Sequence, residues 1–476
     1  MKSKLALTFS IILVLLLLCA LPAAANNMNT TANYLEKSVS GSNYDGMLDW
    51  PILALSQMDR DVSTLITRRE AQVRKGELFE PTKSTDYHRT IIGAVAAGND
   101  PRNFAEYNLI DSVKKSQRSN GKFADSISGT GDFLVNAHIW GIISLFVAGE
   151  TIPNREKALQ WLVDNQNADG GFSIDTRVKS SDIDMTGMAL MAFAALGENQ
   201  NHSAVKKAVE YLRNQQGEKG DFVSWGGASS ESLSQVIQGL IMLGIDPAGP
   251  QWTKRDGNLI TALLAYRRSD GSFSHSPGGP SNIMATYQSM MALNDYYSGE
   301  SIFQKLRREN IRFSDVPERY FAAAAIKRLA AHGVIGGYPD GTFRPANPVK
   351  RQEFAKMIVL TLNKNEPLTS TTRAFRDLPV SHWANPYVKV AVDKGLIQGK
   401  TAQTFAPEEN ITGAEVMTIL IRALGQENNA SPAQGEPWYA GYVRAAEQRG
   451  LLYPGFDPMK PATRAQCAYS LERLLK

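Results

Sequence analysis

Two aspartates stand two residues apart in the segment DIDMT, residues 182–186. A carboxylic acid that its neighbours keep protonated can donate a proton, and a second carboxylate nearby can tune that acid or act as a base. Asp182 and Asp184 are therefore candidate acid–base or ligand-binding residues. Both stand beside an apolar run that starts at Met185 and predicts a helix, so their carboxylates could equally cap that helix by accepting backbone N–H groups.

Cysteine chemistry is excluded from most of the chain. The 476 residues contain only Cys19 and Cys467, so none lies between residues 26 and 300. Zinc sites that need a thiolate and thioesters that need a reactive cysteine are thereby excluded from that region. The sequence predicts no metal site, because no ligand-like spacing relates the six histidines, His88, His138, His202, His275, His332 and His382.

The two aspartates belong to a sequence repeat with a period near 50 residues. Its marker is a glycine turn that ends in phenylalanine, and the markers lie 49, 50 and 51 residues apart, at Phe123, Phe172, Phe222 and Phe273. The helix predicted before each turn is amphipathic, whereas the helix after it is apolar nearly all round. We therefore predict an all-α fold with one ring of helices inside another, an α/α toroid, in which residues 50–98 form a degenerate first hairpin.

The starts of the inner helices converge on one mouth of such a toroid, which makes a concave binding site. The candidate ligand-binding residues there are Asp182, Asp184, Thr186, Trp225, Glu231, Gln235, His275 and Tyr287. Structural roles compete with this interpretation. Glu231 could be a first-turn helix charge, and Gln235 and Tyr287 could bridge neighbouring helices. Trp225, beside two glycines, could cover the rim of the core.

The C-terminal part carries a second repeat, with a period of 62 residues. Its first copy runs from FSDV (313–316) through GYPDGTFRP (337–345), and its second begins at FRDLPVSHWA (375–384). A third copy (437–466) keeps the Trp-to-Gly distance of 12 residues and shortens the following loop by four. We expect a signal peptide, a linker, the toroid and the three copies over residues 1–25, 26–44, 45–300, 312–363, 374–426 and 436–476.

Charge and hydropathy also divide the chain. Residues 1–25 combine two lysines, an apolar stretch and small residues before position 26, which is typical of a secretory signal peptide. A retained membrane anchor is the alternative, although the apolar stretch is short for it, and no other stretch is long and apolar enough to span a membrane. Residues 26–300 have a formal charge of −6 and residues 301–476 one of +8. A basic exported module suits an anionic surface polymer, whereas nucleic acid does not fit an exported protein without basic runs.

The 50-residue repeats resemble the prenyltransferase and squalene-cyclase repeat superfamily, over roughly residues 45–300. DIDMTGMAL (182–190), SSESLSQVIQGLIMLGIDP (229–247) and SHSPGGPSNIMATYQSMMAL (274–293) look most like bacterial, secreted relatives of the vitamin-B12 carriers transcobalamin and intrinsic factor. This resemblance implies a toroid like those of terpenoid cyclases and protein prenyltransferases that binds a corrinoid (cobalamin) without catalysis. Carriers of that branch bind the corrinoid between the toroid and a small β-domain, for which this sequence shows no counterpart.

Enzymes on the same fold provide two tests. Class II terpene cyclases protonate an alkene with the middle aspartate of D-x-D-D-T, and Met185 here replaces the last carboxylate, which argues against that activity. Toroids that cleave polysaccharides use an acid and a base several Å apart. Asp182, Asp184 and Glu231 are the candidates for such a pair.

The 62-residue repeats resemble S-layer homology (SLH) repeats in their FSDV-type start, their GY-x-DGTF-x-P turn and their TRAE-type helix start. The resemblance implies a three-repeat helical spindle that binds secondary cell-wall polysaccharide through Arg351, Arg464, Trp383, Trp438, Asp340 and Gly341. The tryptophans could equally pack in the core. The second copy has Gly413 where the motif has arginine, so we expect its groove to bind less tightly.

The sequence thus predicts a secreted bacterial protein of the cell wall or S-layer, anchored by its SLH repeats, whose toroid binds a ligand, with a corrinoid as the leading guess. Two other interpretations stay open for the toroid. One is a wall-bound enzyme that cleaves polysaccharide, and the other is a structural or protein-interaction module without a small ligand.

Overall fold

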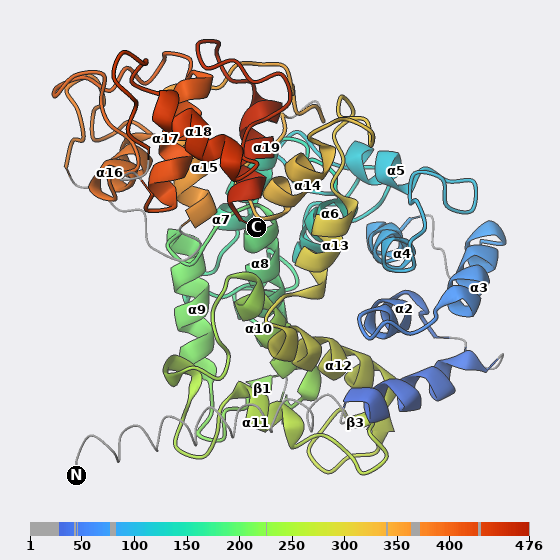
Figure 1. Ribbon diagram of the computed structural model, residues 1–476. Helices are drawn as coiled ribbons and strands as arrows, with labels where there is room; N and C mark the ends of the chain where they lie inside the picture. The colour runs from blue at the N-terminus through green and yellow to red at the C-terminus, as the bar shows by residue number, and fades with distance from the viewer. Residues whose placement is uncertain are drawn as a thin grey trace, which may run out of the picture. The chain divides into compact units, whose positions relative to one another are not determined.

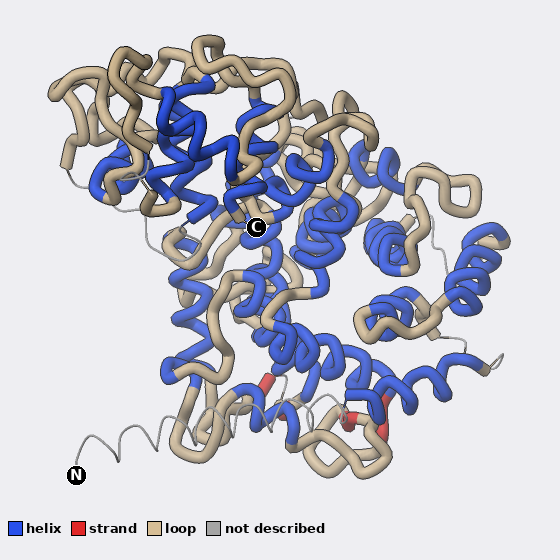
Figure 2. Tube along the Cα trace, in the orientation of Figure 1, coloured by secondary structure: helices blue, strands red, loops and turns tan. Residues whose placement is uncertain are grey.

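The computed structural model describes residues 28–41, 44, 46–76, 82–224, 226–338, 341–362, 372–426 and 430–475. In this part of the chain helices dominate (Figure 2). The strands there are two short antiparallel pairs, β1 (Val223–Ser224) with β2 (Gly227–Ala228) and β3 (Phe273–Ser274) with β4 (Ser281–Asn282). The predicted all-α class is confirmed. No described helix is long and apolar enough to cross a membrane, and the predicted signal peptide lies outside the described residues.

The chain divides into two compact units between Asn310 and Ile311. Each unit has a hydrophobic core of its own. The first, the toroid unit, includes residues 28–40, for which we expected a linker. They form a helix instead, because Met28, Ala32, Leu35 and Val39 recur every three or four residues and bury one face.

Six inner helices form a closed ring in the toroid unit. Each contacts the next, and the last returns to contact the first (Figure 1). They are α2 (Asp49–Ser56), α4 (Ser84–Ala96), α6 (Val135–Val147), α8 (Ile183–Ala195), α10 (Ser230–Met242) and α12 (Ile283–Ser298). The predicted toroid is confirmed.

The outer ring consists of the helix that precedes each inner one. After residues 28–40 these are α3 (Ser63–Arg74), α5 (Leu109–Lys115), α7 (Arg155–Asp164), α9 (Ser203–Gln215) and α11 (Leu259–Leu264). Only one stripe of each is buried, as with Val205, Ala208 and Leu212 of α9. This stripe packs against the inner ring, and the opposite face meets solvent.

The turn phenylalanines tie each outer helix to its inner partner. All four are buried. The backbone N–H groups of three of them donate to inner-helix side chains: Phe123 to His138 Nδ1 (3.0 Å), Phe172 to Thr186 Oγ1 (3.0 Å) and Phe273 to Thr286 Oγ1 (2.9 Å). The preceding Gly121 has a φ of +91° and lies so close to the backbone of Lys157 that a Cβ would clash. Glycine is therefore required at this marker position.

One end of the ring is closed by α13 (Ile302–Asn310). Arg307 donates to the carbonyl oxygens of Phe146 and Glu150 at the end of α6, at 3.3 and 2.7 Å. The α13 N-terminus is fixed by Asp295, which accepts from Ile302 N at 2.8 Å. Burial raises the pKa of Asp295 to about 7. The carboxyl ends of the inner helices are thus covered, and their amino ends face the opposite side of the ring.

The second unit, here called the SLH unit, repeats one helix pair three times: α14 (Ala323–Ala331) with α15 (Arg351–Leu362), α16 (Asn385–Asp393) with α17 (Gly413–Ala423), and α18 (Ala440–Gln448) with α19 (Arg464–Leu474). The second helix of each copy packs on the first helix of the next, and α19 of the third copy packs on α14 of the first. Three isolated β-bridges join the copies in the same cyclic order. The unit therefore has approximate threefold symmetry.

Candidate functional site

The mouth of the toroid is built from equivalent positions of the inner helices. Within the first two turns of α4, α6 and α8, the partly exposed residues are those two and six places after the N-cap. In α10 the same positions are Glu231 and Gln235. Each is 5% exposed, whereas the residues next to them in the helix are only 0–1% exposed. Residues four apart share a helix face, so these side chains line the interior. The lining at these positions of α4 to α12 is Thr85, Arg89, Asn136, Trp140, Asp184, Met188, Glu231, Gln235, Met284 and Gln288.

The aspartates of DIDMT have different roles. Asp182 is the N-cap of α8, and its Oδ1 accepts from Met185 N at 2.8 Å, which is the capping role that competed with the ligand role. Asp184 faces the interior instead. Burial, with the nearby carboxylates of Asp182 and Glu231, raises the pKa of Asp184 to about 6, although a hydrogen bond with Ser232 acts in the opposite direction. Asp184 can therefore hold a proton near neutral pH.

Glu231 of α10 completes an acidic wall beside Asp184. Its Oε2 lies 3.0 Å from Nδ1 of His275, which is 60% exposed in its side chain, and 3.1 Å from Oγ of Ser230. Gln235, one turn further into the ring, donates from Nε2 to Oε1 of Gln288 at 3.1 Å. The predicted set of Asp184, Glu231, Gln235 and His275 thus comes together on α8, α10 and the loop before α12.

An aromatic and basic wall faces these acids. Trp50 of α2 and Trp140 of α6 lie 4.9 Å apart between ring centroids, although α4 separates their helices in the ring. Arg89 of α4 is neutralised by Asp49 (3.2 Å) and by Asp86. The mouth therefore combines an acidic arc with an indole surface, as many small-ligand sites do.

Thr186 is fully buried, and its hydroxyl serves the backbone of Phe172 and of Asp182, so it is a structural residue here. Tyr287 is 4% exposed, and burial strongly raises its pKa. Trp225 lies outside the described residues.

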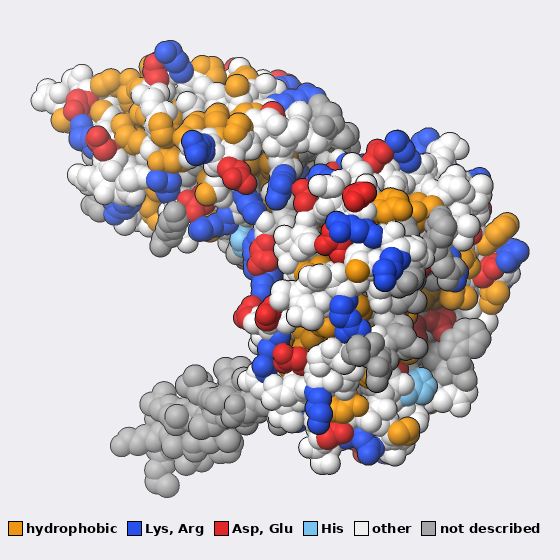
Figure 3. Space-filling view, turned by 90° about the vertical axis from the view of Figure 1, so that its right-hand side faces the viewer, with side chains coloured by type: hydrophobic (Ala, Val, Ile, Leu, Met, Phe, Trp, Pro, Cys, Tyr) orange, Lys and Arg blue, Asp and Glu red, His pale blue; other side chains and the backbone are white. Residues whose placement is uncertain are grey.

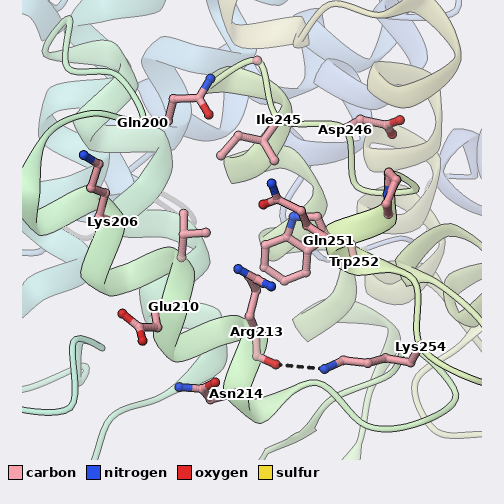
Figure 4. Close-up of a pocket in the computed structure, with 14 residues that line it drawn as sticks. Gln200, Lys206, Glu210, Arg213, Asn214, Ile245, Asp246, Gln251, Trp252 and Lys254 are labelled. Atoms are coloured by element: carbon pink, nitrogen blue, oxygen red, sulfur yellow. Dashed lines mark hydrogen bonds between the residues drawn. The ribbon is translucent and has the colours of Figure 1, made fainter. Parts of the chain in front are cut away.

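A hollow of about 700 Å³ lies on the outside of the toroid unit. It separates α9 from the loop that follows α10, and Figure 4 shows Arg213 and Trp252 on its two sides. The lining includes Lys206, Glu210 and Asp246, of mixed sign. Charges of both signs are also intermixed on the face of the toroid unit in Figure 3, so neither view shows a surface of one charge.

In the SLH unit, Arg351 of the first copy crosses to the second. It is 3% exposed and is held by the carbonyl oxygens of Phe405 (3.0 Å) and Gln398 (2.9 Å) and by Oε1 of Glu415 (2.8 Å). The groove beside it encloses about 190 Å³ and is lined by Lys400, Arg422 and Trp438 among others. Trp438 comes from the third copy and is 56% exposed.

The equivalent groove of the first copy is formed by Arg464. Its guanidinium reaches the carbonyl oxygens of Phe343 (2.8 Å) and Gly336 (2.7 Å) and lies over the ring of Tyr338, but it has no carboxylate partner within the described residues. Trp383 is 48% exposed, with Nζ of Lys356 at 5.9 Å from its ring. Both predicted tryptophans are therefore surface rings rather than core residues.

The third groove differs because Gly413 stands where the others have arginine. A Cβ on Gly413 would clash with the backbone oxygen of Asp457 and would lie 2.7 Å from the hydroxyl of Tyr453. The shortened loop of the third copy has thus closed over the arginine position. Gly341 has a φ of +80° in the turn of the first copy, and Asp340 lies outside the described residues.

Sequence reasoning missed the interior residues that lie outside the quoted motifs. Trp50, Asn136 and Trp140 carry no recognisable motif, and only their distance from the helix N-cap marks them. Each occupies the second or sixth position after its N-cap, and those N-caps come from the structure. Within the described residues no group of three or more His, Cys, Asp or Glu could hold a metal ion.

Comparison with known families assigns both units. The family model described as S-layer homology domain matches residues 312–355 and 374–417, and the one described as prenyltransferase alpha-alpha toroid domain matches residues 135–234 and 235–313. The chain carries SLH domains and a prenyltransferase alpha-alpha toroid domain. The SLH domains relate it to cell-surface and S-layer proteins.

Curated relatives share only part of their length with the chain. A cellulosome-anchoring protein of Acetivibrio thermocellus is 36% identical over 121 residues, which are 25% of this chain and 27% of the relative. The middle cell wall protein of Brevibacillus brevis is 27% identical over 153 residues, 32% and 14% of the two chains. The chain thus spans less than a third of either relative.

Among solved structures, protein geranylgeranyltransferase-I of Candida albicans matches 60% of this chain and 99% of its own, with 12% identity and a TM-score of 0.44.

Proposed function

We propose that the chain is a secreted protein of the bacterial cell wall, held to secondary cell-wall polysaccharide by its SLH unit and displaying the toroid as a ligand-binding module. The SLH family assignment and the cell-surface relatives support the anchoring role. The basic formal charge of residues 301–476, +8, favours an anionic polymer.

One observation carries the polysaccharide proposal: two inter-copy grooves pair an exposed indole with cations. Trp438 lies beside Arg422 and Lys400, and Trp383 lies beside Lys356. An exposed indole can stack on the apolar face of a sugar ring, while lysine and arginine side chains bind anionic substituents. Since Arg351 is occupied by protein acceptors, it shapes its groove, and the less satisfied Arg464 is the better ligand contact.

For the toroid we propose binding of a small ligand in the mouth between the acidic arc and the two tryptophans. The similarity of the repeats to corrinoid carriers makes a corrinoid the first ligand to test. Incubation of the full mature chain with a pool of corrinoids and wall oligosaccharides, followed by native mass spectrometry, tests this role. A retained species supports it, and a chain that retains nothing from the pool rejects it.

Cleavage of polysaccharide is the second candidate for the same mouth. It is favoured by Asp184, whose pKa near 6 suits a general acid, beside the carboxylate of Glu231. Release of new reducing ends from wall oligosaccharides, abolished in Asp184→Asn, would establish it. If the oligosaccharides remain intact after prolonged incubation, the cleavage hypothesis is rejected and the toroid only binds its ligand.

A further inference from the structure

Three consecutive inner helices each present an oxygen without a hydrogen-bond partner at the same helix position. They are Oδ1 of Asn136 in α6, Oδ1 of Asp184 in α8 and Oε1 of Glu231 in α10, each two places after the N-cap. A fourth, Oε1 of Gln235, lies one turn deeper on α10. Buried acceptors normally have partners, because leaving one unpaired costs the free energy of its desolvation. Their recurrence at one position of the repeat indicates an arc of acceptors that a ligand completes.

The arc does not serve the packing of the toroid. Gln235 and Glu231 are each 95% buried, and the partners that they have use only their other atoms, Nε2 toward Gln288 and Oε2 toward His275. Asn136, Asp184 and Glu231 also lie on helices that contact each other in sequence around the ring. The free oxygens therefore face a common space inside the mouth.

The chemistry of the arc selects for donors and for positive charge. Every unpartnered atom in it is an acceptor, and two of the four belong to carboxyl groups. Arg89, the base among the interior positions, is already paired with Asp49 and Asp86. A protonated amine supplies up to three donors and a positive charge, and hydrogen bonds to charged groups are stronger than those between neutral groups.

The other residues of the interior favour a ligand in which the amine is attached to a ring. Trp50 and Trp140 are half-buried, and their ring centroids lie 4.9 Å apart. Met188 of α8 and Trp140 of α6 both occupy the sixth position after their N-caps, one turn deeper than Asp184 and Asn136. Indole faces pack well against the apolar face of a sugar. We propose that the toroid mouth binds a saccharide with a free amino group, whose ammonium is held by Asp184, Glu231 and Gln235 and whose ring packs on Trp50 and Trp140.

This inference rests on the proposed ligand-binding role of the toroid and is tested on the full mature chain. The probes are a glucosamine tetramer with free amines and the same tetramer fully N-acetylated, with binding measured by isothermal titration. We expect the free-amine tetramer to bind more tightly by at least about tenfold, since acetylation removes the charge and two donors. Glu231→Gln, which keeps the shape of the side chain, removes this preference, and the double change with Asp184→Asn removes binding.

Glu210→Gln is the matched control, because Glu210 is an exposed acid of α9 on the outside of the ring. It leaves the preference intact. Equal binding of the two tetramers, or an unchanged preference in Glu231→Gln, overturns the inference. If neither tetramer binds but the native mass spectra show a retained corrinoid, the amine inference fails while the ligand-binding role stands. If the spectra show no retained species either, both fail.

Discussion

Gly413 shows at the scale of a single residue how the three copies of the SLH unit became unequal. Arg351 and Arg464 occupy the corresponding places in the other copies, and each inserts beside a phenylalanine of the neighbouring copy. Gly413 faces the third copy, whose shorter loop brings the backbone of Asp457 against it. The sequence predicted a weaker groove from the missing arginine alone, whereas the structure shows that an arginine would not fit.

The clash gives a stability prediction. Gly413→Ala places a methyl group against a backbone oxygen that cannot move aside easily, and we expect it to destabilise the SLH unit by on the order of 1–3 kcal/mol. Thermal unfolding of the full chain measures this. Gly336→Ala is the control, because its Cβ would meet nothing within 4 Å. Similar melting temperatures for the two variants would show that the third copy can move aside.

His88 provides a prediction for pH. It is fully buried, neither ring nitrogen has a hydrogen-bond partner, and burial lowers the pKa of His88 to about 3 from its ordinary 6.5. Stability that is present above pH 6.5 is therefore lost as the pH falls from there toward 3, by up to about 1.4 kcal/mol per pH unit. His138, buried with its pKa lowered to about 3, acts in the same direction.

Urea unfolding at neutral pH and at about pH 5 measures this loss. We expect His88→Met to lose less stability over that interval than the natural chain. His332→Gln, a change at an exposed histidine, serves as the control and leaves the loss unchanged. A loss in His88→Met as large as in the natural chain would contradict the assigned pKa.

Among the candidate ligand residues, sequence reasoning could find the residue types but not their directions. DIDMT predicted that its two aspartates share one role, either capping or chemistry, because the letters do not show where the helix begins. The structure starts α8 at Ile183, which makes Asp182 the cap and turns Asp184 inward. Thr186 was expected at the mouth, but it is only two residues after Asp184 and so lies on another face of α8, where it is a buried support of Phe172.

At the scale of elements, α13 closes the toroid on the side away from the mouth. Phe303 is 1% exposed and lies 6.2 Å from the ring of Trp140, so this short helix supports the indole surface from below. We predict that Phe303→Ala lowers the free energy of unfolding by roughly 3–5 kcal/mol, as loss of a buried phenylalanine does. It should also weaken ligand binding, since Trp140 loses its support.

Chemical denaturation and ligand titration of the same Phe303→Ala preparation check both effects. Phe321→Ala, at a phenylalanine that is 41% exposed, is the control for the loss of an aromatic ring. A Phe303→Ala chain as stable as this control would mean that α13 is not part of the toroid core.

The sequence repeats predicted which helices exist more accurately than they predicted where the toroid unit begins. The phenylalanine markers located the inner helices because a fixed period leaves few arrangements, and four of the six hairpins follow from them. Residues 28–40 were expected to be a linker because no marker precedes them, although the spacing of Leu35 and Val39 is helical. The lining of the mouth depends on rotation of each helix about its axis, which packing decides and a single sequence does not show.

The whole molecule joins an SLH unit, related to those of cell-surface proteins, to a toroid for which we propose ligand binding. The central claim is that the SLH unit holds the wall through its secondary polysaccharide, by the exposed rings of Trp383 and Trp438 and the cations beside them. The double change of both tryptophans to alanine should weaken wall binding by about tenfold or more, since each aromatic contact is worth roughly 1 kcal/mol. Met459→Ala, at another exposed apolar side chain of the SLH unit, is the control.

The most direct test is co-sedimentation of the full mature chain with wall fragments, before and after chemical removal of their secondary polymer. We expect the chain and the Met459→Ala variant to sediment with intact fragments and to stay in solution with stripped ones. The double tryptophan variant should stay largely in solution with both. Sedimentation with stripped fragments as complete as with intact ones would contradict the central claim.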